Sequence, residues 1–180
     1  MSVKNRNSVV TDGLVFYADA GNEDSYSWSG TTWNDMISGN LGTLYNGPTF
    51  DSANGGSIDF DGSNDRTDFP SDSSFKPTGS MTLLVWAKGQ SGSTSIGIAG
   101  ALGASGDRGY FIGCNTSQFR FSIASNSTTL VNVTATHTDT TSAPFMLTGV
   151  YSASTHLKLY KNTSEIASNT TSIPATQYVG

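Results

Sequence analysis

Five oxygen-bearing side chains lie between residues 59 and 68, and together they could form a cation site. They are Asp59, Asp61, Asn64, Asp65 and Asp68, and Ca²⁺ takes about six to eight oxygen ligands. Their spacing differs from that of the EF-hand loop, and an Asp-Gly pair in a tight turn needs no metal. The pattern therefore favours a turn, with a calcium site at Asp59, Asp61, Asn64 and Asp65 as the alternative.

A second candidate site is aromatic. Tyr26 and Trp28 lie among Ser and Gly with no apolar period, so we expect exposed rings on a loop. Exposed rings can stack on sugars or contact another protein, while packing within the loop is the alternative. Asp107 and Arg108, close to Tyr110, could add hydrogen bonds to a ligand, and a salt bridge within their turn is the alternative.

The residue types that glycosidases and triad hydrolases need are sparse. Glycoside hydrolysis uses two carboxyl groups on one face, roughly 5 to 10 Å apart. The two Glu residues, Glu23 and Glu165, lie far apart in the chain and belong to no such cluster. His137 and His156 lie in polar surroundings without a nucleophile motif, and we expect both to face solvent. We therefore predict that the protein is not an enzyme.

The composition indicates which elements carry these residues. The chain has 180 residues, of which 27 are Ser, 23 are Thr and only 13% are charged. Few Glu, Lys and Arg disfavour helices, whereas Thr, Val, Tyr and Phe at short intervals favour strands. About ten strands are expected, so the fold class should be all-β, a two-sheet antiparallel β-sandwich.

Several strands can be placed from the sequence pattern. The apolar stretch 81–88 predicts a central strand with Trp86 in the core, and 118–124 alternates as a strand with one wet face. Further strands are expected at 14–18, 108–114, 129–135, 144–151, 156–161 and 165–168, with 57–60 and 66–69 forming a hairpin around 61–65. Residues 1–12 read as an extended N-terminal arm, and we predict one sandwich domain over 13–180.

Charge and hydropathy narrow the range of partners. The formal net charge of −5 argues against nucleic acid, which requires clustered Lys and Arg. No apolar window is long enough to insert into a membrane, and the polar N-terminus lacks the apolar core of a signal peptide. We therefore expect synthesis in a cytoplasm. Cys114 is the only cysteine, which rules out an internal disulfide, and we expect it to be buried at a strand end.

Six segments, in this order, carry a resemblance to a known family. They are GLVFYADAGN (13–22), SGTTWNDMISGNLGTLYNGPTF (29–50), GGSIDFDGSND (55–65), MTLLVWAK (81–88), GYFIG (109–113) and FMLTGVYSASTHLKLYKN (145–162). The ordered set resembles the concanavalin A-like, laminin G-type jelly-roll domains, in the branch found in virion and cell-surface proteins of bacteria and their phages. The start MSVKNRNSVVTDGLVFYADAGN (1–22) resembles stand-alone phage structural proteins in particular. The resemblance implies a two-sheet jelly roll with a carbohydrate- or partner-binding role, and it does not imply catalysis.

Two departures refine what the resemblance implies. Family members usually continue beyond the segment matching 173–180 with further strands, so either this sandwich is shortened or a neighbouring subunit supplies the missing edge. An open edge of this kind invites pairing with another chain. Trp28 stands where relatives tend to have small turn residues.

The resemblance favours a non-enzymatic virion structural protein, assembled in the host cytoplasm as a capsid decoration, head-fibre or tail-associated subunit. Expected partners are other virion subunits, either as a homo-oligomer or docked on the capsid or tail, together with weakly bound surface glycans. No cofactor is expected apart from the Ca²⁺ alternative. A calcium-assisted lectin is the second interpretation, and a glycoside hydrolase is the third.

Overall fold

The computed structural model describes residues 9–88, 96–101, 109–115, 117–137 and 143–179, and these residues are almost entirely β-structure. All strand pairs are antiparallel, which confirms the predicted all-β class. The chain divides into two compact units, Met1–Phe75 and Lys76–Gly180. The single domain predicted over 13–180 stays a prediction.

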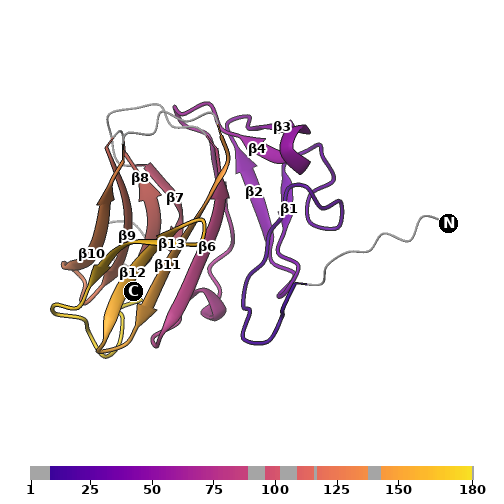
Figure 1. The fold of residues 1–180 in the computed structure, drawn as a ribbon. Helices are drawn as coiled ribbons and strands as arrows, with labels where there is room; N and C mark the ends of the chain where they lie inside the picture. The colour runs from indigo at the N-terminus through magenta and orange to yellow at the C-terminus, as the bar shows by residue number, and fades with distance from the viewer. Residues whose placement is uncertain (1–8, 89–95, 102–108, 116, 138–142, 180) are drawn as a thin grey trace. The chain divides into compact units, whose positions relative to one another are not determined.

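Two four-stranded sheets make up the second unit, and they face each other in Figure 1. One sheet has the order β10-β9-β8-β7, and the other has the order β13-β12-β11-β6. The strand bounds are β6 (Met81–Ala87), β7 (Ile96–Ala101), β8 (Tyr110–Cys114), β9 (Gln118–Ala124), β10 (Leu130–Thr136), β11 (Phe145–Ser152), β12 (His156–Lys161) and β13 (Ser164–Asn169).

Alternate side chains of both sheets form one apolar core between them. Phe121 and Ile112 come from one sheet, Leu147 and Leu159 from the other, and all four are fully buried. Period-2 alternation brings these residues onto the inner faces, where burial provides most of the driving force for folding. Cys114 is buried at the end of β8, as predicted.

A glycine brings the two sheets close together. Gly149 occupies an inward position of β11 between the buried Leu147 and Tyr151. A Cβ at Gly149 would lie 2.4 Å from the ring of Phe121, which is closer than real contacts allow. The Phe121 ring therefore packs directly on the backbone of the opposite sheet, and any side chain at position 149 would displace it.

The prediction for strand 81–88 is wrong in two respects. β6 is the edge strand of its sheet and not a central one, and Trp86 is 69% exposed. Met81, Leu83, Val85 and Ala87 alternate toward the core, so Trp86 and Leu84 necessarily point the other way. The strand was apolar on both faces, and composition alone could not show which face lies inward.

The predicted wet face of β9 is only partly wet. Ser122 is fully buried, and its hydroxyl donates a hydrogen bond of 2.7 Å to Asn132 Oδ1 on β10. Arg120 donates to the same oxygen, at 3.0 Å from Nη2, and its guanidinium lies 5.3 Å from the centre of the Phe111 ring. These contacts between β9 and β10 place polar side chains on the outer face, where they form hydrogen bonds with one another.

The first unit has shorter strands and more loop. Its sheets are β1-β2-β5 and β3-β4, formed by β1 (Thr32–Asn34), β2 (Leu41–Tyr45), β3 (Thr49–Asp51), β4 (Ser57–Asp59) and β5 (Arg66–Asp68), with 3-10 turns at Ala53–Gly55 and Ser73–Phe75. Two predictions fail here. Residues 14–18 form no strand, and β4 pairs with β3 while β5 pairs with β2, so 57–69 is not a hairpin.

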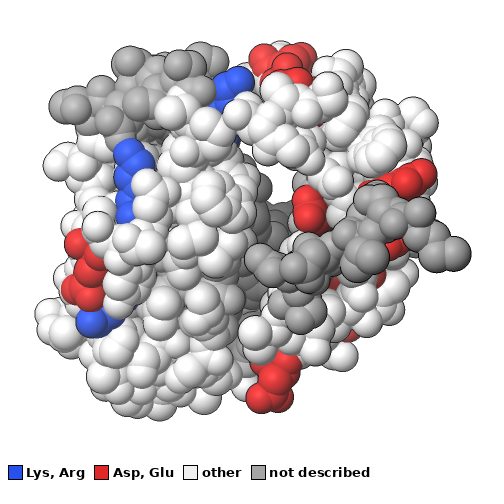
Figure 2. Space-filling view, turned by 45° about the vertical axis from the view of Figure 1, so that its right-hand side comes forward, with Lys and Arg blue, Asp and Glu red and all other residues white. Residues whose placement is uncertain are grey.

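The two units carry opposite formal charge. The first has three Lys or Arg against eleven Asp or Glu, a formal charge of −8, and the second has six against three, a charge of +3. Most of the face seen in Figure 2 nevertheless carries neither sign. No helix among the described residues is long and apolar enough to cross a membrane.

Candidate functional site

The acidic segment proposed as a calcium site folds as a hydrogen-bonded turn. Asp61 Oδ1 accepts the backbone N–H of Ser63 at 2.8 Å and that of Asn64 at 3.3 Å. The first of these bonds is the main cause of a lowered pKa at Asp61. Asp65 Oδ2 accepts the backbone N–H of Asp61 at 3.0 Å and closes the turn.

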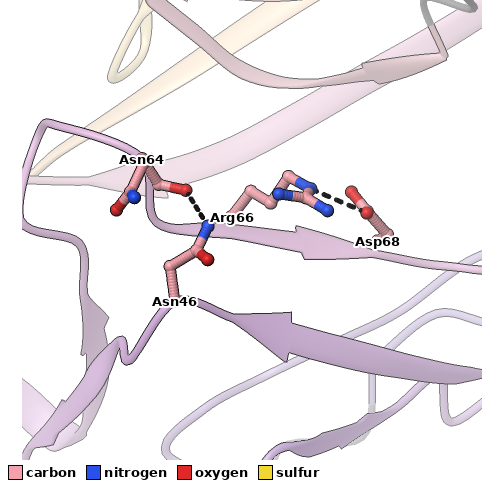
Figure 3. A network of polar contacts seen from close by, with 4 residues as sticks. All are labelled: Asn46, Asn64, Arg66 and Asp68. Carbon is pink, nitrogen blue, oxygen red and sulfur yellow. Dashed lines mark hydrogen bonds and ion pairs between the residues drawn. The ribbon is translucent and has the colours of Figure 1, made fainter.

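Side-chain hydrogen bonds hold the chain where it leaves the turn and enters β5, as Figure 3 shows. Asn46 Nδ2 donates to the carbonyl of Asn64 at 2.6 Å, and Arg66 Nε donates to Asp68 at 2.8 Å. Asn46 adopts a left-handed φ of 71°, which Asn tolerates better than most residues, just after β2. Turn bonding therefore accounts for Asp61 and for Oδ2 of Asp65, whereas Asp65 Oδ1 is buried without a hydrogen-bond partner among the described residues. No three His, Cys, Asp or Glu among the described residues are grouped to hold a metal.

The two aromatic candidates on the loop differ in exposure. Tyr26 is only 2% exposed, its hydroxyl donates to the carbonyl of Gly30, and its ring contacts Trp33, so the predicted exposure of Tyr26 is wrong. Trp28 is 46% exposed and stacks on Phe50 at 6.2 Å between ring centres. The other candidates, Asp107 and Arg108, lie outside the described residues.

Asp35, which the sequence analysis did not single out, is the most completely buried carboxylate described. Its side chain is 0% exposed and accepts the backbone N–H groups of Tyr17 at 2.9 Å and Ile37 at 3.1 Å. The other oxygen accepts the backbone N–H and the hydroxyl of Ser38. The sequence Asp-Met-Ile-Ser at 35–38 could have indicated this role, because Asp and Ser three residues apart commonly form hydrogen bonds within a turn. The role of Asp35 is to tie the 13–18 segment to the turn after β1.

The described part of the second unit has a groove of about 690 Å³. It lies where the edge strands β10 and β13 come together, and Asn169 Nδ2 links the two strands by donating to the carbonyl of Asn132 at 2.9 Å. Thr134, Ala135 and Thr136 of β10 form one wall. Ile166 of β13 lines the groove as well, with the edge of the buried Phe119 ring.

His137 lines this groove and is half-buried, so its predicted solvent-facing position is wrong. Its ring stacks on Phe119 at 4.2 Å between centres, and Nε2 lies 3.0 Å from the carbonyl oxygen of Asn115. A carbonyl only accepts, so Nε2 carries the proton and Nδ1 holds the lone pair in the neutral ring. Nδ1 is buried and has no hydrogen-bond partner among the described residues.

Among the described residues, Lys161 is the charged side chain that lines the groove. It follows the inward alternation of Leu157 and Leu159 on β12, and its ammonium lies 5.3 Å from the Phe119 ring centre and 5.8 Å from that of Phe145. Such distances are typical of cation–π contacts. The sequence analysis did not identify this residue, because the meeting of β10 and β13 joins residues far apart in the chain.

On the opposite face of β12, Lys158 and Glu165 form a separate pair. Lys158 Nζ lies 2.8 Å from Glu165 Oε2, and Tyr160 donates its hydroxyl to the same oxygen at 3.2 Å. The bond from Lys158 is the main cause of a lowered pKa at Glu165, and it also raises the pKa of Lys158. The single Glu of the second unit is therefore engaged on the outer surface, away from the core side of the sheet.

A family model described as the concanavalin A-like lectin/glucanases superfamily matches residues 61–179, which is well over half of the chain. The matched range includes the described residues that line the groove and all strands of the two-sheet sandwich. No curated protein and no solved structure matches the chain.

Proposed function

Because the chain belongs to the concanavalin A-like lectin/glucanases superfamily, we propose that it is a non-enzymatic binding module that acts by adhesion. The observation that carries this proposal is the groove between β10 and β13. A cation, an imidazole and threonine hydroxyls line it, and no carboxylate does so among the described residues. Such a lining can bind a polar ligand, but it lacks the acid and base pair of a hydrolase.

The distribution of carboxylates supports the non-enzymatic part of the proposal. A glycosidase of the usual kind needs two carboxyl groups across one sugar. Among the described residues of the second unit, Glu165 is the sole Asp or Glu, and it is bonded to Lys158. Asp107 and Asp139 of this unit lie outside the described residues. Release of reducing sugars from β-glucans by the purified protein would overturn this part of the proposal.

At a finer level, we propose that the module is a structural subunit of a bacteriophage virion, as a capsid decoration, head-fibre or tail-associated protein. Two features support this placement: the resemblance of the sequence of residues 1–22 to stand-alone phage structural proteins, and the edge strands of the sandwich. β6, β7, β10 and β13 each end a sheet among the described strands, and edges of this kind can pair with neighbouring subunits.

An inventory of purified particles tests this placement. Mass spectrometry of virions separated by density gradient should find the chain at a stoichiometry fixed relative to the major capsid protein. Cryo-electron microscopy should then show the sandwich docked on the head or tail. A chain that stays in the soluble fraction of the lysate while particles are complete would contradict the virion role and leave the binding role untouched.

Exposed Trp28 favours a second candidate, a glycan-binding lectin. An indole that is 46% exposed offers a flat face to a sugar, and its φ of 62° is unusual for a bulky residue. If the lectin role is the main one and Ca²⁺ assists it, Ca²⁺ should raise the melting temperature, and Trp28→Ala should remove the glycan-array signal. Neither change is expected for a purely structural subunit.

A further inference from the structure

We propose that the outer face of the sheet β1-β2-β5, in the first unit, binds one neutral pyranose unit of a glycan. In this assignment the exposed ring of Tyr45 packs on the sugar, and the carboxylate of Asp68 accepts hydrogen bonds from its hydroxyl groups. The inference rests on the proposed adhesion function and deepens it by naming a site and a ligand class. The site uses none of the residues that line the groove between β10 and β13.

Strand pairing brings the side chains of this site together. In β2, Leu41, Thr43 and Tyr45 are exposed while the residues between them are buried, so the three share the outer face. β5 pairs with β2 so that Asp68 lies opposite Thr43 and Arg66 lies opposite Tyr45. The Cβ atoms of directly opposed residues lie about 5 Å apart, so a small ligand on this face meets side chains of both strands.

A hollow of about 230 Å³ lies over these side chains. Its lining comes from the first unit and consists of Leu41, Thr43, Tyr45, Asp68, Phe69 and Pro70. The volume is below the range of about 300–1,000 Å³ that is usual for drug-sized ligands, so the hollow suits a single sugar unit.

The charges of the site balance one another. Arg66 Nε lies 2.8 Å from Asp68 Oδ2, as Figure 3 shows, and the Arg66 guanidinium lies 4.4 Å from the centre of the Tyr45 ring. Because the cation already has an ionic and an aromatic partner, it gives the site no net attraction for an anion. The first unit carries a formal charge of −8, which opposes anionic ligands further. A neutral ligand matches this environment.

Three exposed polar groups of the site can bond to a ligand. The pair with Arg66 uses only Oδ2 of Asp68. The other oxygen of Asp68 and the hydroxyls of Thr43 and Tyr45 have no hydrogen-bond partner among the described residues. The Asp68 side chain is 52% exposed and Tyr45 is 40% exposed, so a ligand reaches these groups from solvent. The carboxylate is the strongest of the three acceptors, because a hydrogen bond to an ionised group is roughly twice as strong as a neutral one.

Apolar surface beside these groups separates a sugar from water or a simple alcohol as the ligand. Leu41 is 59% exposed, and the part of the Tyr45 ring that Arg66 does not cover adds a flat apolar face. A pyranose carries hydroxyls around its rim and C–H groups on its faces, so it covers apolar surface and bonds to polar groups at the same time. A neutral pyranose is thus the ligand class that matches the ring, the aliphatic side chain, the carboxylate and the hydroxyls together.

A hydrogen bond outside the hollow holds the two strands in place. Asn46, directly after Tyr45, donates from Nδ2 to the carbonyl of Asn64 at 2.6 Å, and this bond fixes the start of β5 beside the end of β2. The ring of Tyr45 is in turn held by the guanidinium of Arg66. Side chains that are fixed before binding lose less conformational entropy when the ligand binds.

The test is an NMR titration of the full chain with the methyl glycosides of glucose, galactose and mannose and with the uronic acid form of each. We expect at least one neutral glycoside to bind saturably at millimolar concentration and to shift the backbone amides of Leu41, Thr43 and Asp68. The uronic acid form of the same sugar should bind about threefold more weakly or worse, because the net charge of the first unit repels it.

Variants of the site assign the contacts. Tyr45→Ala should weaken the neutral glycoside about tenfold, whereas Tyr45→Phe keeps the ring and should weaken it less than about threefold. Asp68→Asn keeps the size of the side chain, removes the ionised acceptor and should weaken binding about fivefold. Phe60→Ala is the matched control, because it removes a ring of similar exposure, 42%, from the same unit and should change the affinity less than about twofold.

Tyr45→Ala also removes the ring on which Arg66 lies, so a second variant keeps the assignment testable. Thr43→Trp leaves Tyr45 and Arg66 in place, suits a strand and fills the hollow, and it should abolish binding. Melting temperatures identify any variant that fails to fold.

Three results would overturn the assignment: no saturable binding of any neutral glycoside at millimolar concentration, equal losses in Tyr45→Ala and Phe60→Ala, or a uronic acid form that binds as tightly as its neutral counterpart. These outcomes are separate from failure of the proposed function. Particle association without glycoside binding would refute this inference alone, whereas release of reducing sugars from β-glucans would contradict the non-enzymatic function and leave this site in place.

Discussion

Different interactions stabilise the interior of each of the two units. The second unit buries apolar side chains of two sheets against each other, with Phe121 lying on the backbone of Gly149. The first unit has short strands, an aromatic cluster and one buried carboxylate, Asp35, that accepts bonds from three neighbouring residues. An apolar core of this kind should tolerate changes on its outer faces, whereas a loop-rich unit depends on single polar groups.

The largest effect should come from truncating the apolar contact between the sheets. Phe121→Ala removes a fully buried ring and leaves a cavity above Gly149, so the free energy of unfolding should fall by about 3–5 kcal/mol. Chemical denaturation followed by tryptophan fluorescence and circular dichroism measures the loss. Trp86→Ala is the control, because it truncates an exposed aromatic residue and should cost less than about 1 kcal/mol. A cost at Trp86 equal to that at Phe121 would show that the β6 face is assigned wrongly.

A smaller and more local effect is expected in the first unit. Asp35→Ala leaves the N–H groups of Tyr17 and Ile37 buried without an acceptor, which should cost about 3 kcal/mol. Hydrogen exchange should accelerate at these two amides while Leu159 keeps its protection. Asp35→Asn keeps one accepting oxygen, so its loss of stability should lie between those of the wild type and Asp35→Ala. Unchanged exchange at Tyr17 in Asp35→Ala would refute the role given to the carboxylate.

What the sequence could predict follows the same division. In the second unit, the strands predicted at 118–124, 144–151 and 156–161 correspond to β9, β11 and β12, and the alternation in 118–124 was informative because burial of one face imposes a period of two. Prediction from the sequence failed at β6, where both faces are apolar. The sequence does not show that β6 is an edge strand or which of its two faces packs against the core. In the first unit, tertiary hydrogen bonds such as that from Asn46 to Asn64 set the pairing, so 57–69 looked like a hairpin and is not.

Prediction of the candidate sites from the sequence was limited in the same way, because it depended on which residues become neighbours in the fold. Short-range chemistry was interpreted correctly at Asp61, where an Asp-Gly turn explains the carboxylate. Tyr26 and Trp28 share a loop and a composition, yet one ring is buried and the other is exposed, because burial depends on Trp33 and Phe50 as neighbours. The groove was invisible in the sequence, since Phe119, His137 and Lys161 meet only when the two sheets close.

The smallest predicted effect compares two exposed carboxyls, one in each unit. Asp61 and Glu165 both have a lowered pKa, but a backbone N–H of Ser63 is the main cause at the first and the Lys158 ammonium at the second. In both cases the stabilisation is present above the ordinary carboxyl pKa and is lost as the pH falls through the lowered value.

Salt should separate the two carboxyls. At about 1 M salt the screening length falls to about 3 Å, so the exposed ion pair weakens and the pKa of Glu165 should move back toward its ordinary value. The backbone bond at Asp61 depends little on screening, so the pKa of Asp61 should stay low. NMR titration of the side-chain carboxyl carbons at two salt concentrations measures both, and Lys158→Gln should reproduce the salt effect at Glu165. An equal response of the two groups to salt would mean that charge, and not the turn geometry, holds the Asp61 loop, and the contrast between the units would then fail at their surfaces.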